Sequence, residues 1–187
     1  MLIPFFEQNH NLRCLHVDGE NDICSCFLLE TNLLADSLSR FNTLREVSFN
    51  RWGNRDGDGN GGTLIRALAH HRNLTKIDIN RSKIMGGKGT MTALAYLLAN
   101  PYSSVEDLQI RRLSLGDEGA IILGTALARN STLRNLDLSC NLSIKTAGWT
   151  AIFAQLQSAQ SLETLDLSQN PGICNSAANV LANSLAN

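Results

Sequence analysis

The sequence predicts an α/β solenoid, a curved stack of strand–turn–helix units with a parallel sheet on the concave side and helices on the convex side. Two observations predict this fold class. The pattern apolar-x-x-apolar-x-apolar occurs six times in 187 residues, and its first positions lie 28 to 32 residues apart. A turn and then a stretch of helical periodicity follow the pattern, so one small unit repeats along the chain.

The six copies define the expected strands. Their apolar positions are Leu12, Leu15, Val17; Leu44, Val47, Phe49; Leu74, Ile77, Ile79; Val105, Leu108, Ile110; Leu133, Leu136, Leu138; and Leu162, Leu165, Leu167. The second half of each pattern alternates, as a short strand with one buried face does. We therefore expect a single domain over 1–187, with about six repeats that start near residues 12, 44, 74, 105, 133 and 162.

The expected helices follow from apolar residues at helical spacing, for example in 121–129, 150–156 and 177–185. One strand–helix unit cannot bury its apolar side alone, whereas stacked units bury one repeat against the next. A helix is wider than the strand spacing of about 4.8 Å, so the stack should curve with its strands inside.

The segments LRNLDLSCN (133–141) and LETLDLSQN (162–170) resemble leucine-rich repeats. Units of 28 to 32 residues with a full helix resemble the ribonuclease-inhibitor-like class, which implies a right-handed horseshoe segment and, for function, mainly protein binding. The resemblance also implies that Asn141 and Asn170, at the ninth position, bond backbone groups of neighbouring repeats. Trp52, Ser82 and Leu113 stand at that position in earlier copies, where we expect less regular turns.

Composition excludes several function classes. Sixteen basic and seventeen acidic residues give a net charge of −1, which does not suit a nucleic-acid-binding protein. No apolar run approaches the roughly 18 residues of a membrane span. Five cysteines without paired spacing predict reduced thiols, and hence an intracellular, cytoplasmic setting, rather than a disulfide framework. No nucleophile is matched to the histidines, which we expect to be exposed or to cap a helix.

The concave face carries the residues most suited to binding. If the strands align, the residue two places beyond the third apolar position forms a column that includes Arg51, Arg81 and Arg112, with Trp52 and Arg111 beside it. Arginine and tryptophan are frequent interface hot spots, and clustered arginines favour a carboxylate-rich partner. A second column lies between the second and third apolar positions. It comprises His16, Ser48, Asp78, Gln109, Asp137 and Asp166. The alternative is a solvated face whose charges pair internally.

The segment DGDGNG (56–61) is a candidate calcium loop. Asp56, Asp58 and Asn60 alternate oxygen ligands as in an EF-hand. The twelfth position, however, is Ala67 where an EF-hand has a bidentate glutamate. An insertion of turn-forming residues explains the same pattern, and we expect no cofactor and no metal.

The expected function is therefore a non-enzymatic protein-interaction scaffold or adaptor. The alternatives are a GTPase-activating regulator, which rests on fold analogy alone, and a structural subunit of a large assembly. A solenoid normally ends in a polar capping repeat. The last repeat lacks one, so we expect a longer array, or a C-terminal end that docks on a further repeat or subunit.

Overall fold

A computed structural model describes residues 9, 11–18, 27–51, 61–82, 86–113 and 115–186. Within these ranges strands and helices alternate. The strands are β1 (Cys14–Asp18), β2 (Glu46–Asn50), β3 (Lys76–Asp78), β4 (Asp107–Gln109), β5 (Asn135–Asp137) and β6 (Thr164–Asp166). The helices are α2 (Phe27–Ser39), α3 (Gly61–Leu68), α4 (Lys88–Ala99), α5 (Gly116–Leu127), α6 (Thr146–Leu156) and α7 (Asn175–Leu185).

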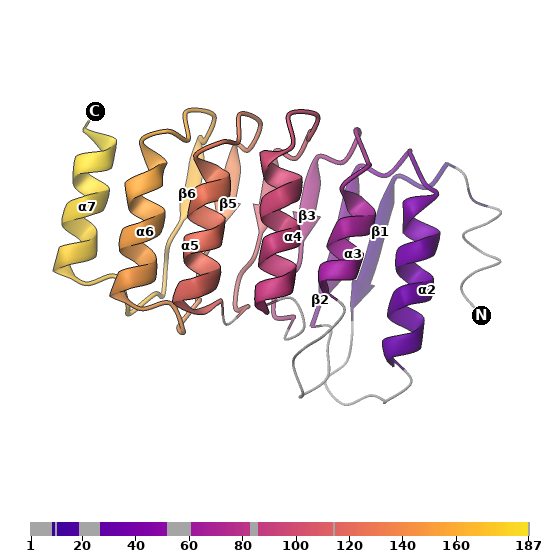
Figure 1. The fold of residues 1–187 in the computed structure, drawn as a ribbon, viewed down its shortest axis with the longest axis horizontal. Helices are drawn as coiled ribbons and strands as arrows, with labels where there is room; N and C mark the ends of the chain where they lie inside the picture. The colour runs from indigo at the N-terminus through magenta and orange to yellow at the C-terminus, as the bar shows by residue number, and fades with distance from the viewer. Residues whose placement is uncertain are drawn as a thin grey trace.

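The strands form one parallel sheet in chain order, β1-β2-β3-β4-β5-β6. The helices stand side by side in a second layer over one face of that sheet (Figure 1), and each helix contacts the next one in the chain. The other face of the sheet, which we call the open face, carries no described helix. The α/β class and the parallel sheet are thus confirmed, whereas the curvature of a horseshoe stays a prediction.

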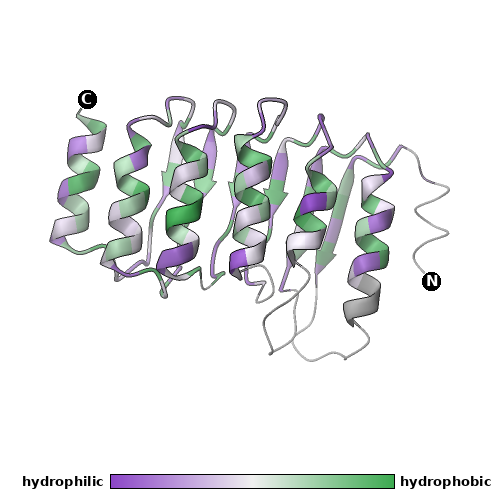
Figure 2. Ribbon diagram, viewed as in Figure 1, coloured by the Kyte–Doolittle hydropathy of each residue, from purple (hydrophilic) through white to green (hydrophobic). Residues whose placement is uncertain are grey.

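The register of the sheet aligns equivalent positions of all six repeats. Leu15 pairs with Val47, and the row continues through Ile77, Leu108, Leu136 and Leu165. The four inner members are buried, whereas Leu15 and Leu165 on the edge strands are half-buried. Hydrophobic residues recur in each helix, interleaved with hydrophilic ones (Figure 2). The core therefore lies between the sheet and the helix layer, and it is continuous from repeat to repeat.

The strands β2 to β6 each lead into a residue of the same backbone conformation. Arg51, Arg81, Arg112, Cys140 and Gln169 all have φ between 54° and 59°. This left-handed region costs a residue with a Cβ about 1–2 kcal/mol. The turn is held by bonds between repeats: the amide of Arg51 donates to the carbonyl of Asn80 (3.0 Å), and that of Arg81 to the carbonyl of Arg111 (2.8 Å). The predicted column is thus one repeated structural position.

Buried asparagine side chains join the turns of neighbouring repeats by hydrogen bonds. The Asn141 amide donates to the carbonyls of Ile110 (2.9 Å) and Leu138 (3.0 Å), and its oxygen accepts from the Leu113 amide (3.0 Å). Asn170 likewise donates to the carbonyls of Leu138 and Leu167. The expected role of the two asparagines in linking repeats is confirmed.

Ser82 takes the asparagine's place in an earlier repeat. Its hydroxyl donates to the carbonyl of Phe49, which is the third apolar position of the preceding repeat. Asn141 and Asn170 bond the equivalent carbonyls, those of Ile110 and Leu138. A serine therefore provides part of the same link, and the turn at Ser82 is more regular than the sequence pattern predicts.

The Asn141→Ala variant should lower the free energy of unfolding by about 2–4 kcal/mol, because three buried backbone groups lose their partner together. Urea unfolding measures the change. Asn135→Ala, at an exposed position of β5, is the control and should change stability by no more than about 0.5 kcal/mol. A loss below about 1 kcal/mol for Asn141→Ala would contradict the role of this side chain.

Candidate protein-binding face of the sheet

The open face presents the two predicted columns of polar residues, and a further row of aligned residues that runs from Cys14 through Glu46, Lys76, Asp107 and Asn135 to Thr164. Alternation along β1 leaves Cys14, His16 and Asp18 exposed while Leu15 and Val17 face the core. The second column predicted from sequence is confirmed by the strand register: His16, Ser48, Asp78, Gln109, Asp137 and Asp166 pair in succession. Charges and amides, not apolar groups, therefore dominate this surface.

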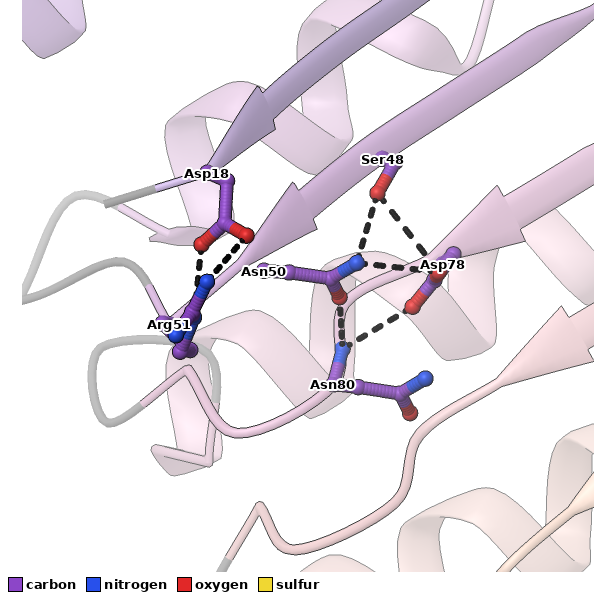
Figure 3. A network of polar contacts seen from close by, with 6 residues as sticks. All are labelled: Asp18, Ser48, Asn50, Arg51, Asp78 and Asn80. Carbon is purple, nitrogen blue, oxygen red and sulfur yellow. Dashed lines mark hydrogen bonds and ion pairs between the residues drawn. The ribbon is translucent and has the colours of Figure 1, made fainter. Parts of the chain in front are cut away.

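The three predicted arginines have different surroundings. Arg51 is held by Asp18: its Nε and Nη2 donate to the two carboxylate oxygens at 2.8 and 2.6 Å (Figure 3). This hydrogen bonding, together with the positive charges of Arg51 and Arg81, keeps the pKa of Asp18 below its ordinary value. Arg81 and Arg112 are exposed at the equivalent positions of the next two repeats. Arg51 is thus paired internally, as the alternative interpretation holds.

A polar network joins β2 to β3 beside that ion pair. The Asn50 amide donates to the Ser48 hydroxyl (2.9 Å) and to Asp78 (3.1 Å), as Figure 3 shows. The Asn50 oxygen accepts from the backbone amide of Asn80 at 3.0 Å, and Asp78 accepts from that amide too. Asp78 therefore stabilises the strand end, which limits its availability to a partner.

The two other aspartates of the column have the same turn geometry. Asp137 accepts from the amide of Ser139 and Asp166 from the amide of Ser168, both at 2.8 Å. The backbone and hydroxyl bonds of Ser168, and then the charge of Arg111, lower the pKa of Asp166. These carboxylates hold their own turns, as aspartates that form Asx turns do. Their acidic character is therefore partly structural.

Arg111 and Cys140 form a small cluster in the turns that follow β4 and β5. Arg111 Nη2 donates to the Cys140 sulfur (3.6 Å), and the thiol donates to Gln169 Oε1 (2.8 Å). Burial raises the pKa of the Cys140 thiol, but hydrogen bonds from Arg111 and Arg112 outweigh it and leave the pKa lowered. The pKa of Arg111 is raised by Cys140 and by the charges of Asp137 and Asp166. The charge of Arg111 is therefore offset within the turns, while its buried Nε has no hydrogen-bond partner among the described residues.

Several residues singled out in the sequence lie outside the described part of the chain. They are Trp52 and the calcium candidates Asp56, Asp58 and Asn60. The position where a calcium-binding glutamate would stand is described: Ala67 lies in α3 and is buried in the core. Because an apolar side chain fills that place, the twelfth ligand of an EF-hand has no counterpart here.

His71 is not exposed, but it does bond the end of a helix, namely the last turn of α2 in the neighbouring repeat. It is 5% exposed, and its Nε2 lies 2.9 Å from the carbonyl of Leu38 in the neighbouring repeat. Burial lowers the pKa of this imidazole. A histidine directly after a helix gives no sequence signal of burial, because the covering helix belongs to another repeat.

Sequence reasoning did not single out Cys174, an exposed cysteine directly before α7. Its sulfur lies 3.0 Å from the Ser176 hydroxyl and 3.3 Å from that of Thr146. Bonds from those hydroxyls, and from the backbone amides of Ala177 and Ser176, lower the pKa of the Cys174 thiol to about 6. The signal available in the sequence was a cysteine at a helix start followed two residues later by serine.

Comparisons with known proteins support the fold alone. Neither a protein-family model nor a curated protein sequence matches the chain. Among solved structures, it is similar to one titled "Leiomodin-1 Actin-Binding Site 2 (ABS2)", with 12% identity and a TM-score of 0.50 over 97% of this chain and 83% of that chain. Within the described residues, no helix is both long and apolar enough to cross a membrane.

Alkylation of Cys174 by iodoacetamide should follow a titration with a midpoint near pH 6, because only the thiolate reacts. Peptide mass spectrometry of the reduced protein measures the rate between pH 4 and 9. Ser176→Ala removes the largest stabilising bond and should move the midpoint upward. A rate that still rises steeply between pH 7 and 9 in the wild type would contradict the lowered pKa.

Proposed function

We propose that this chain is a non-enzymatic protein-interaction module of the leucine-rich-repeat type, which binds an acidic segment of a partner through its open face. The repeated strand–helix units and the aligned polar columns support the proposal. Short strands held at constant register place equivalent side chains side by side, which suits recognition of an extended surface. We also propose that the C-terminal end of the last repeat docks on a further repeat or subunit.

One observation carries the proposal: Arg81 and Arg112 occupy the same left-handed turn position in adjacent repeats, and both are exposed. Neither forms an ion pair within the described residues. Their backbones are separated by about one strand spacing. Two exposed guanidinium groups at such a separation repel each other and gain from a carboxylate placed between them, which an arginine fork binds in a bidentate manner.

The surrounding face is well suited to present these two side chains. Arg51 is paired with Asp18, Lys76 pairs with Asp107 at 3.2 Å, and the aspartates of the second column accept turn amides. These contacts use the carboxylates of the face internally. Arg81 and Arg112 therefore have no carboxylate partner among the described residues and keep their positive charge for a partner, although Arg112 also hydrogen-bonds the Cys140 thiol.

The double variant Arg81→Glu/Arg112→Glu should reduce partner binding by about tenfold or more, because two favourable contacts become repulsive. The tagged wild-type protein and the tagged double variant are each used for native pull-down, and the bound proteins are quantified by mass spectrometry. Arg66→Glu/Arg129→Glu is the matched control. It makes the same change in charge at exposed positions in α3 and after α5, and should retain the partners of the wild type.

Urea unfolding of the variants separates binding from folding, since exposed charge changes should leave stability nearly unchanged. Loss of the same partners from both double variants would indicate a dependence on overall charge and contradict a site at the open face. If Arg81→Glu/Arg112→Glu still binds all partners of the wild type, a site at the open face is contradicted as well.

A further inference from the structure

Three side chains of metal-binding chemistry meet at the β1 edge of the open face. They are Cys14 and His16 on β1 and Glu46 on β2. The Cys14 sulfur, a His16 ring nitrogen and a Glu46 carboxylate oxygen all lie within 4.8 Å of one another. Nothing in the arginine-based binding proposal uses these residues, so the cluster raises a separate question.

The sheet itself fixes this arrangement. Cys14 and His16 are two residues apart on one strand, so their side chains share a face. Glu46 is the cross-strand partner of Cys14 in the parallel β1–β2 pair, and Ser48 is the partner of His16. Three donors thus project from two hydrogen-bonded strands. A metal ion would need little backbone rearrangement to bind them.

The three side chains are also available. None of them forms a hydrogen bond or ion pair with another part of the chain that the structure describes. Lys76, the next residue after Glu46 in the same column, is a potential competitor for its carboxylate. Its ammonium group instead pairs with Asp107 on the far side, at 3.2 Å. Glu46 therefore keeps its oxygens for another ligand.

We propose that Cys14, His16 and Glu46 form a site for a divalent transition metal of the zinc type. A thiolate, an imidazole and a carboxylate are the three zinc ligand classes, at about 2.3 Å for sulfur and about 2.0–2.2 Å for nitrogen and oxygen. Donors around a tetrahedral ion lie about 3.5 Å apart, so small side-chain rotations close the site. A thiolate and a carboxylate together balance the charge of the ion.

The site leaves one tetrahedral position to solvent, because Cys14 and His16 are exposed on the open face. Zinc held by three protein ligands keeps its fourth position for water or another donor. Hard cations such as magnesium prefer oxygen ligands throughout, and this donor set disfavours them.

Titration of the reduced, chelator-stripped full-length chain with zinc, followed by competition with a chromogenic chelator, tests the site. We expect the wild type to bind one zinc ion per chain and to show no comparable binding of magnesium. Cys14→Ser, His16→Ala and Glu46→Gln should each weaken zinc binding by about 100-fold or more, since even outer-shell changes cost 10–100-fold. Cys174→Ser, which removes another exposed thiol, should leave it unchanged.

Cobalt substitution reports on the ligands directly. The wild type and Cys174→Ser should show thiolate-to-cobalt charge-transfer absorption, and Cys14→Ser should lose it while its circular dichroism stays that of the wild type. Absence of zinc binding by the wild type overturns the proposal. Binding that the Cys14, His16 and Glu46 variants leave intact, or that Cys174→Ser abolishes, overturns it too.

Discussion

Backbone hydrogen bonds between parallel strands, which keep the same register across the sheet, are the constraint on which the other features of this structure depend. Leu15, Val47, Ile77, Leu108, Leu136 and Leu165 lie in one row because each strand pairs with the next at the same repeat position. A shift by one residue would turn this row to the open face and bury the polar columns instead. Core burial and surface chemistry are therefore set by the same pairing.

This constraint divides the polar residues of the open face by function. Those that close the turns are structural: Asn141 bonds three backbone groups, and Asp137 and Asp166 each accept a turn amide. Arg81 and Arg112 have the same turn geometry as Cys140, yet their side chains are exposed. Because the backbone shape is supplied by the repeat, the side chain at this position is free to vary. In the proposed function it is this variable position that contacts the partner.

The sequence predicts the strands, the parallel order and both columns, because a strict spacing of apolar residues can be satisfied by only one register. It does not predict which charges pair. Asp18 lies 33 residues from Arg51, and their bidentate contact depends on side-chain conformations that no pattern specifies. The cluster of Cys14, His16 and Glu46 could have been found by extending the column analysis two residues earlier in each strand, to the next position on the same face. The burial of His71 could not, because it depends on how closely adjacent helices approach.

Nuclear Overhauser contacts between neighbouring strands test the central claim most directly. In uniformly labelled protein, the parallel register should give sequential contacts from the backbone protons around Leu15 to those around Val47, and onward through Ile77, Leu108, Leu136 and Leu165. Contacts shifted by one residue, or close α-proton pairs of the antiparallel kind, would contradict the aligned columns. The assignment of the open face would then be wrong.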